Sequence, residues 1–522
     1  MATLPRQLAC ASVRRVSISS GSQHAADAGA DIADSGGNAV DAAIAAVIVS
    51  MCTEPGIIAP GCSGFVTIWP QTGDPIVIDG YAEMPGRGLP QDRFGSEMRV
   101  HLDYGGGLET IVGPGSVATP GVFAALGIAS ERHGRLPWRE VVEPAALAVE
   151  KGFALSSAAA QYLVYSHESI FGWQEESRAA VHDEQGQRLD EGELVHIPHL
   201  AETLRQIGEE GPATFYEGDV GARIAESVQE MGGLLTRADL AAYEAVVRTP
   251  LVIPLDEWQI ATNPAPAVGG ATLAAILLLL DDHPFGSWNE EEVRRLVRVQ
   301  RAVLEYRTRR LEPANDRVAE ATRLLDMARV GDLPGIVASP STIHTSTVDT
   351  DGTGCSITMS AGYGSGFMAP GTGMWMNNSL GEVELHPGGF HGLPPGSRLF
   401  SNMAPTIARA ANGSVLAIGS PGADRITTAI SSVLLNFVHL GMSLRDAITH
   451  PRVHAEVFGG QPTIAHEPGL PVADFDGLVA RRFPDLSMYF GGVQATLHDP
   501  RAGLFEAADP RRDGGTARGG SD

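Results

Sequence analysis

The sequence predicts a mixed α and β fold with a large hydrophobic core. Apolar residues make up 43% of the 522 residues, which is enough for such a core. The middle of the chain reads mostly as helices, and it ends with a long charged helix at 290–311. After residue 342 the pattern changes to short alternating strands separated by glycine turns. The length fits several domains or one large unit, and these patterns leave both open.

The first third of the chain contains two helices followed by two strands. Small residues predict a helix from His24 that ends at Gly36-Gly37, and the Ala- and Val-rich run 38–50 predicts a second, buried helix. A glycine loop at 61–64 leads into the first strand, and the second strand covers 76–79. The residues that follow this second strand stand where binding residues are common.

The middle of the chain supplies the predicted helices. A Gly/Pro loop at 112–118 precedes them, and it lacks the lysine and the spacing of a phosphate loop, so no nucleotide site is expected there. The predicted helices cover 141–151, 200–210, 221–231, 271–280 and 290–311.

The last third is rich in strands and glycine. Strands are predicted at 345–349, 355–359 and 415–418. The last of these runs into a glycine turn at 419–425 and then a helix at 426–440. Backbone N–H groups of such a turn suit a developing oxyanion, although a tight turn that needs glycine only for steric reasons has the same sequence. The tail is expected to be an ordered loop at 509–515 followed by a frayed end.

Composition limits the classes of partner. The chain has 37 basic and 62 acidic side chains and a net charge of −25, which argues against nucleic acid or an anionic membrane as partner. Its four cysteines show no C-x-x-C spacing, so neither a disulfide framework nor a metal site is predicted. The most apolar run is too short to span a membrane, and the N-terminus lacks the apolar stretch of a clear signal peptide. We expect a cytoplasmic protein, with export by another route left open.

Thr342 is the candidate reactive residue. It opens a predicted strand directly after a loop-like linker that contains 331–335 and Ser339-Pro340. If the chain is cut before Thr342, the new α-amino group can act as a general base for the threonine hydroxyl. On these residues alone, Thr342 is more simply a strand-forming residue in a run rich in Ser and Thr, and the rest of the chain decides between the two interpretations.

Collinear motifs along almost the whole chain, from about residue 24 to 515, resemble those of the γ-glutamyltransferase (γ-glutamyltranspeptidase) family of N-terminal-nucleophile hydrolases. The motifs are GGNAVDAA, EP…G..GF, LPW…EPA, TFYEG, GGLLT..DL..Y, T.H.S..D.DG, GSG…PGTG…NN and GSPG.DRI. The resemblance implies a proenzyme that cuts itself before Thr342 into a large subunit, 1–341, and a small catalytic subunit, 342–522. It also implies an α+β fold, a four-layer αββα sandwich in which both subunits stay together as a heterodimer, with a dimer of heterodimers left open.

The resemblance assigns catalytic roles to four residues. Thr342 would be the nucleophile for self-cleavage and for catalysis, and Gly422 and Ala423 would supply oxyanion N–H groups. Ala423 replaces the family's usual second glycine, which a backbone donor should tolerate. Ser360 is the provisional counterpart of a helper threonine. No metal and no organic cofactor is implied.

The resemblance places five residues in the substrate pocket, and three of them, Asn402, Tyr81 and Glu382, differ from the family. Ser401 and Asn402 stand where the family has a Ser-Ser pair, and Asn378 is retained. Tyr81 occupies the position of an arginine that grips the substrate α-carboxylate, a charged bidentate contact that tyrosine cannot reproduce. Glu382 keeps the negative charge of the family's Asp pair, which holds the α-amino group, but is longer by a methylene.

The resemblance therefore predicts a self-processing amidohydrolase or acyltransferase with an altered acyl-binding pocket. It would act on a small-molecule amide or γ-glutamyl substrate, with water or an amine as acceptor. Three alternatives remain. The first is a true glutathione hydrolase and γ-glutamyltransferase in which another cation replaces the missing arginine, with Arg87 as the first candidate. The second is an oxamate amidohydrolase-like or β-lactam acylase-like enzyme, and the third is an unprocessed, non-catalytic paralogue.

Overall fold

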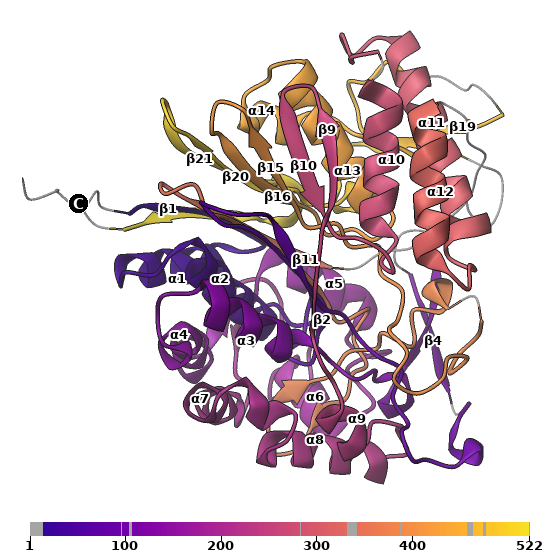
Figure 1. Ribbon diagram of the computed structural model, residues 1–522. Helices are drawn as coiled ribbons and strands as arrows, with labels where there is room; N and C mark the ends of the chain where they lie inside the picture. Colours follow the sequence, from indigo (N-terminus) through magenta and orange to yellow (C-terminus); the bar gives the residue numbers. More distant parts are fainter. Residues whose placement is uncertain are drawn as a thin grey trace, which may run out of the picture.

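The protein forms a four-layer sandwich in which two β-sheets lie face to face between two layers of helices (Figure 1). The structure is a computed structural model that describes residues 14–95, 97–103, 107–281, 283–330, 342–386, 388–456, 463–472 and 477–520. The predicted α+β class and its αββα layering are confirmed.

The first sheet has seven antiparallel strands in the order β22-β1-β11-β12-β2-β3-β8. Their bounds are β1 (Val16–Ser20), β2 (Ser63–Trp69), β3 (Ile76–Gly80), β8 (Val246–Arg248), β11 (Ile343–Asp349), β12 (Gly354–Ser360) and β22 (Gly515–Gly519). Strands β2, β11 and β12 are buried along their whole length, because both faces of the sheet are covered.

The second sheet has six strands in the order β21-β20-β16-β15-β10-β9. Their bounds are β9 (Leu251–Leu255), β10 (Trp258–Thr262), β15 (Thr406–Ala410), β16 (Val415–Gly419), β20 (Gln494–Asp499) and β21 (Gly503–Ala508). Side-chain hydroxyls join the two sheets: Ser346 donates to the backbone oxygen of Gln494 at 3.1 Å, and Ser356 donates to that of Ile418 at 3.1 Å.

Helices α1 (Gln23–Asp34), α2 (Ala39–Thr53) and α3 (Val122–His133) cover the outer face of the first sheet. Every residue of α2 is buried, and small side chains allow that close packing. A capping box between Asn38 and Asp41 satisfies the first backbone N–H groups of α2. Further helices extend this layer: α4 (Trp138–Lys151), α5 (Ser157–Ser166), α6 (Glu175–Ala180), α7 (Leu200–Glu210), α8 (Asp219–Glu230) and α9 (Arg237–Ala241).

The outer face of the second sheet is covered by α10 (Gly269–Asp281) and α13 (Arg425–Leu434). Three more helices complete this layer: α11 (Glu290–Tyr306), α12 (Arg317–Val330) and α14 (Leu444–Thr449). Short strands form the smaller sheets: β4 (Met98–Leu102) with β5 (Leu108–Val112), β6 (Phe153–Ala154) with β7 (Leu194–Val195), β13 (Met368–Ala369) with β14 (Met374–Trp375), and β17 (Val453–Glu456), β18 (Thr463–His466) and β19 (Val479–Arg482) together.

Each large sheet contains strands from both sides of Thr342. In the first sheet, β11, β12 and β22 pair among β1, β2, β3 and β8, and in the second sheet β9 and β10 extend β15. The segments before and after Thr342 therefore share one folded unit. The predicted subunit boundary itself falls at residue 341, outside the described residues.

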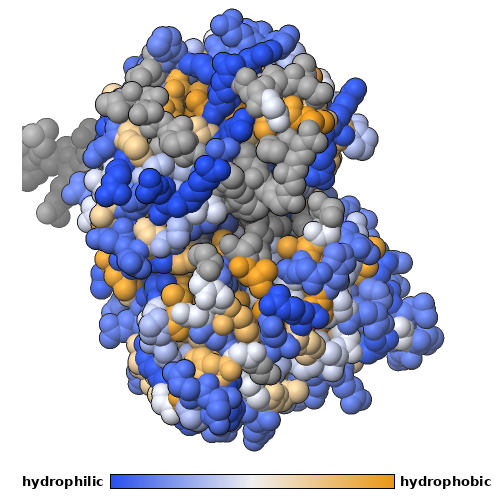
Figure 2. Space-filling view, turned by 90° about the vertical axis from the view of Figure 1, so that its right-hand side faces the viewer, coloured by the Kyte–Doolittle hydropathy of each residue, from blue (hydrophilic) through white to orange (hydrophobic). Residues whose placement is uncertain are grey.

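Most predicted elements are confirmed, and the tail is a correction. The helix predicted at 200–210 is α7, and the strand predicted at 415–418 is β16. The end of the chain is not frayed through residue 520: β22 pairs with β1, because this strand completes the edge of the first sheet. Among the described residues, no helix combines the length and apolar character needed to cross a membrane. On the face seen in Figure 2, hydrophobic residues are scattered among hydrophilic ones.

Candidate active site

Thr342 lies at the start of β11, at one end of the interface between the two sheets. Its side chain is buried, with a relative exposure of 3%. The register pairs His344 with Thr358 and Ile343 with Met359, so the next pair in the same register is Thr342 and Ser360. Because side chains alternate along a strand and Ser346 faces the second sheet, Thr342 and Ser360 are placed on that inner face as well.

The same row continues across the sheet to Tyr81. Ser360 pairs with Ser63, and the pair after Gly64 and Gly80 is Ser63 and Tyr81. Residues opposite one another in a sheet share a face, so the four side chains line one inner edge. Three strand spacings of about 4.8 Å separate Thr342 from Tyr81, or about 14 Å. The fold thus brings three residues predicted from the sequence (Thr342, Ser360 and Tyr81) to one end of the sandwich.

His344, two residues after Thr342, is a buried neutral histidine. Its Nδ1 lies 2.8 Å from Thr358 Oγ1, and its Nε2 lies 2.8 Å from Ser346 Oγ. Burial lowers the pKa of His344 to about 3. A Cβ at Gly419 would lie 2.2 Å from the His344 ring, so only glycine lets β16 approach this closely. His344 therefore links β11 to β12, and its pKa lies well below neutral pH.

The predicted oxyanion turn lies between β16 and α13 and reaches Thr342. Pro421, Thr342 and His344 line the same small pocket. Gly422 has φ +119°, and a Cβ there would lie 2.8 Å from Gly491 Cα. Ala423 has φ +54°, in the left-handed region that favours glycine. The chain therefore keeps a glycine-type turn while carrying alanine at its second position.

Two charged residues that the sequence interpretation did not place in the site also line the pocket around Thr342: Glu54 and Arg512. Arg512 Nη1 donates to the backbone oxygen of Thr342 at 3.4 Å. Glu54 is buried, with 3% exposure, and burial raises its pKa to about 7. Glu54 belongs to the motif EP…G..GF, but the motif alone assigned no role to its side chain.

Tyr81 packs as an aromatic core residue. Its ring stacks on that of Phe65, with centroids 5.6 Å apart and an interplanar angle of 14°. Its backbone oxygen accepts hydrogen bonds from the hydroxyl of Tyr243 at 2.7 Å and from Arg398 Nη1 at 2.5 Å. The cation beside Tyr81 is therefore Arg398, from the loop that precedes Ser401, and the sequence interpretation missed it.

Arg398 and Arg87 are both already paired with carboxylates. Arg398 lies 3.9 Å from Asp79 and 3.5 Å from Glu83. Arg87 lies 3.2 Å from Glu83 and 3.4 Å from Asp239. A substrate carboxylate that used either guanidinium would have to compete with these partners.

Asn378 and Glu382 approach the residues just after Ser360. A Cβ at Gly362 would lie 2.2 Å from Asn378 Oδ1 and 3.2 Å from Glu382 Oε1, and both side chains are buried. Asn378 Nδ2 donates to Thr110 Oγ1 at 3.1 Å and to the backbone oxygen of Ile111 at 3.0 Å. The two predicted binding residues thus lie together near the end of β12.

Ser401 and Asn402 are buried where the second sheet meets α10. The Ser401 hydroxyl accepts from the backbone N–H of Met403 at 3.2 Å. Asn402 Oδ1 accepts from Arg307 Nη2 at 2.5 Å, and Arg307 Nε donates to Glu312 at 2.7 Å. An ion pair therefore fixes the orientation of Asn402, which makes its amide a rigid rather than an adaptable contact.

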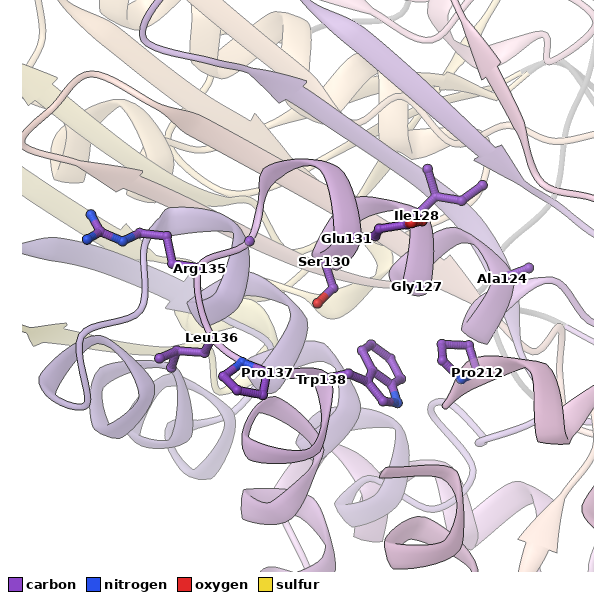
Figure 3. Close-up of a pocket in the computed structure, with 11 residues that line it drawn as sticks. Ala124, Gly127, Ile128, Ser130, Glu131, Arg135, Leu136, Pro137, Trp138 and Pro212 are labelled. Atoms are coloured by element: carbon purple, nitrogen blue, oxygen red, sulfur yellow. The ribbon is translucent and has the colours of Figure 1, made fainter. Parts of the chain in front are cut away.

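Two other features lie outside this site. A pocket of about 630 Å³ opens between α3 and the start of α4, with Trp138 and Pro212 among its lining residues (Figure 3). A group of potential metal ligands, His167, Glu168 and His182, has its ligand atoms within 4.8 Å of one another. His167 Nδ1 and His182 Nε2 are 3.0 Å apart, so the two imidazoles form a hydrogen bond with each other.

Comparisons with known proteins show the family of the chain and its fold. The chain is 29% identical to the glutathione hydrolase proenzyme of Escherichia coli (strain K12), over 93% of this chain and 89% of that protein. It is 29% identical to the acylase ACY 1 proenzyme of Pseudomonas sp. (strain V22), over 94% and 91%. The solved cephalosporin acylase from Bacillus halodurans has the same fold, with a TM-score of 0.77, 23% identity and 99% of both chains covered. Residues 25–519 match the family description Gamma-glutamyltranspeptidase, and the protein belongs to that family of enzymes.

Proposed function

We propose that this enzyme is a self-processing threonine amidohydrolase and acyltransferase whose acyl-binding pocket differs from a γ-glutamyl pocket. The observation that carries the proposal is the row from Thr342 through Ser360 to Tyr81 on one inner face of the first sheet. At one end of this row is a hydroxyl beside a glycine-type turn, and at the other is an aromatic ring whose neighbouring cations are already paired.

The proposed reaction uses groups of the chain alone. Thr342 Oγ attacks the amide carbonyl of the substrate, while the free α-amino group of Thr342 takes its proton and returns it to the leaving amine. The backbone N–H groups of Gly422 and Ala423 stabilise the tetrahedral oxyanion. The acyl group remains as an ester on Thr342 until water, or a competing amine acceptor, releases it. This chemistry requires no metal and no organic cofactor.

The free α-amino group requires a cut between Ser341 and Thr342, which gives subunits 1–341 and 342–522. Two relatives support this step, because the glutathione hydrolase and the acylase are both named as proenzymes. The shared sheets support a stable heterodimer after the cut. Denaturing gel electrophoresis of purified protein should give two bands, and the smaller fragment should begin Thr-Ile-His-Thr-Ser. A folded, soluble wild-type protein that stays uncut would contradict the proposal.

A substrate panel distinguishes this proposal from a true glutathione hydrolase. The similarity to a glutathione hydrolase proenzyme and the acidic Glu382 near Gly362 favour that second candidate. The acylase similarity and Tyr81 favour an acyl group without a free amino-acid head. Glutathione, a γ-glutamyl anilide, oxamate and simple acyl amides should be compared by kcat/KM, and we expect the γ-glutamyl donors to rank below the best acyl amide.

A further inference from the structure

The proposed self-cleavage lacks a base in the uncut chain. Before the cut, the nitrogen of Thr342 is an amide nitrogen, which cannot accept the hydroxyl proton as the later α-amino group does. His344 is held between two hydroxyls, and burial lowers its pKa to about 3, so it is a poor acceptor near neutral pH. Another group at Thr342 must take the proton.

Glu54 has the position for this role. It follows α2 directly, and its side chain lines the same small pocket as Thr342, together with Arg512. Glu54 Oε1 is buried and has no hydrogen-bond partner among the described residues. A Cβ at Gly21 would lie 3.5 Å from each carboxylate oxygen, so glycine leaves room for this carboxyl group. Burying a carboxyl group with an unpaired oxygen costs free energy of folding, and a catalytic role is one explanation for keeping such a group.

The groups around Glu54 suit proton exchange near neutral pH. Burial raises the pKa of Glu54 to about 7, against the lowering effects of the Ser50 and Ser22 hydroxyls and of Arg512, while Asp513 adds to the rise. Thr342, the neutral His344 and Gln494 are the other polar residues that line the pocket. Near neutral pH the carboxyl is divided between a form that accepts a proton and a form that donates one.

We propose that Glu54 is the general base of self-cleavage and, once protonated, its general acid. The inference rests on the proposed function. Glu54 takes the proton of Thr342 Oγ, directly or through one water, as Oγ bonds to the carbonyl carbon of the preceding residue. The C–N bond to Thr342 then breaks, and Glu54 returns the proton to the departing nitrogen. Water hydrolyses the resulting ester, which releases the new carboxyl end and restores the threonine hydroxyl. The net change is the addition of one water molecule.

The test is a time course of cleavage in full-length protein made by cell-free synthesis and transferred to buffers between pH 5.5 and 8.5. Wild-type cleavage should slow about tenfold per pH unit below about pH 7 and level off above it. Glu54→Gln, which keeps the shape but removes the base, should cleave at least about a hundredfold more slowly at pH 7.5. Glu54→Asp should fall between the two.

Asp41→Asn is the matched control. Asp41 is a buried carboxyl at the other end of α2, and burial raises its pKa to about 6. Its removal should change thermal stability but leave the pH profile of cleavage as in wild type. In Glu54→Ala, formate should restore part of the cleavage, because the vacated space admits a small carboxylate next to Thr342. A merely structural role for Glu54 predicts no such rescue.

The outcomes separate the two proposals. Wild-type protein that never cleaves contradicts the proposed function. Cleavage of wild type with a rate that is flat from pH 5.5 to 8.5, or of folded Glu54→Gln at the wild-type rate, overturns the role of Glu54 and leaves the proposed function standing. Equal slowing in Glu54→Gln and Asp41→Asn would likewise assign Glu54 a structural role. If Glu54→Gln does not fold, the wild-type profile and the formate experiment decide.

Discussion

The two ends of the row from Thr342 to Tyr81 differ in how they handle charge. Around Thr342 the described hydrogen bonds run mainly between hydroxyls, a neutral histidine and backbone groups, with Glu54 and Arg512 in the pocket. Around Tyr81, guanidinium groups and carboxylates are paired in a network. Under the proposed function, the first end transfers a proton, whereas the charged groups at the second end are already paired with one another.

This difference bears on specificity. A charged substrate head at the Tyr81 end would have to compete with existing ion pairs. Breaking a partly buried ion pair leaves one charge uncompensated, which costs several kcal/mol. The proposed function therefore keeps the reaction chemistry of the family and changes the acyl group that is recognised.

The largest effect should come from removing the nucleophile. Thr342→Ala should remain a single full-length chain and hydrolyse none of the panel substrates, because both steps need Oγ. Gel electrophoresis and amide hydrolysis measure the two losses. Since Thr342 is buried and small, the folded state should persist, as judged by circular dichroism. Residual cutting at the same bond would move the nucleophile to another residue.

The second effect tests the charged end of the row. Tyr81 can give the substrate α-carboxylate one neutral hydrogen bond, where an arginine gives two charged ones, and this should cost about 2–3 kcal/mol of transition-state stabilisation. We therefore expect kcat/KM for a γ-glutamyl anilide to be about a hundredfold below that of relatives with the arginine. Tyr81→Arg should raise it, by about tenfold, since Arg398 nearby opposes a second cation. Tyr81→Phe serves as the control and should leave γ-glutamyl hydrolysis low. An efficient wild-type enzyme would favour the glutathione hydrolase alternative.

The third effect concerns His344 and the pH dependence of stability. With a folded pKa of about 3 against 6.5 unfolded, His344 binds a proton more readily in the unfolded chain. Its contribution is therefore present above pH 6.5 and lost as the pH falls, by up to about 1.4 kcal/mol per pH unit. In His344→Leu the free energy of unfolding should fall by about 2 kcal/mol at pH 7, because two buried hydroxyls lose a partner. The gap between the variant and wild type should shrink below pH 6 and reverse near pH 5, where the variant becomes the more stable protein. A constant gap would show that the pKa of His344 is the same in the folded and the unfolded chain.

The smallest effect should come from the turn beside Thr342. Ala423 occupies the left-handed region, which costs a non-glycine residue about 1 kcal/mol. Ala423→Gly should raise the free energy of unfolding by about 0.5 kcal/mol, since the flexibility of glycine in the unfolded chain offsets part of the gain. Activity should change less than twofold, because a backbone N–H remains. A large change in kcat would give the alanine methyl group a role in binding.

Local patterns in the sequence predicted the elements, and the motifs predicted their layering. Glycine pairs and small-residue runs located α1, α2 and α10, because these signals act within one element. The row from Thr342 to Tyr81 could not be predicted, because it depends on the register of four strands that are distant in sequence. The positions of Arg398 and Glu54 could not be predicted for the same reason. Arg398 lies in a loop and Glu54 follows α2, and each reaches the row only through contacts with strands distant in sequence. The φ of Ala423 is likewise set by the fold, because alanine itself disfavours it.

The edge of the first sheet has a practical consequence. Strand β22 lies against β1, with Val16 opposite Gly519, and Gly520 packs against the backbone of Arg14. A short linker could therefore join these two points and allow a circular permutant whose first residue, after removal of the initiator methionine, is Thr342. Such a chain would gain its reactive amine on removal of the initiator methionine, without self-cleavage. It would let acyl transfer be measured in variants that no longer cleave themselves. The effect of a substitution on catalysis could then be separated from its effect on maturation.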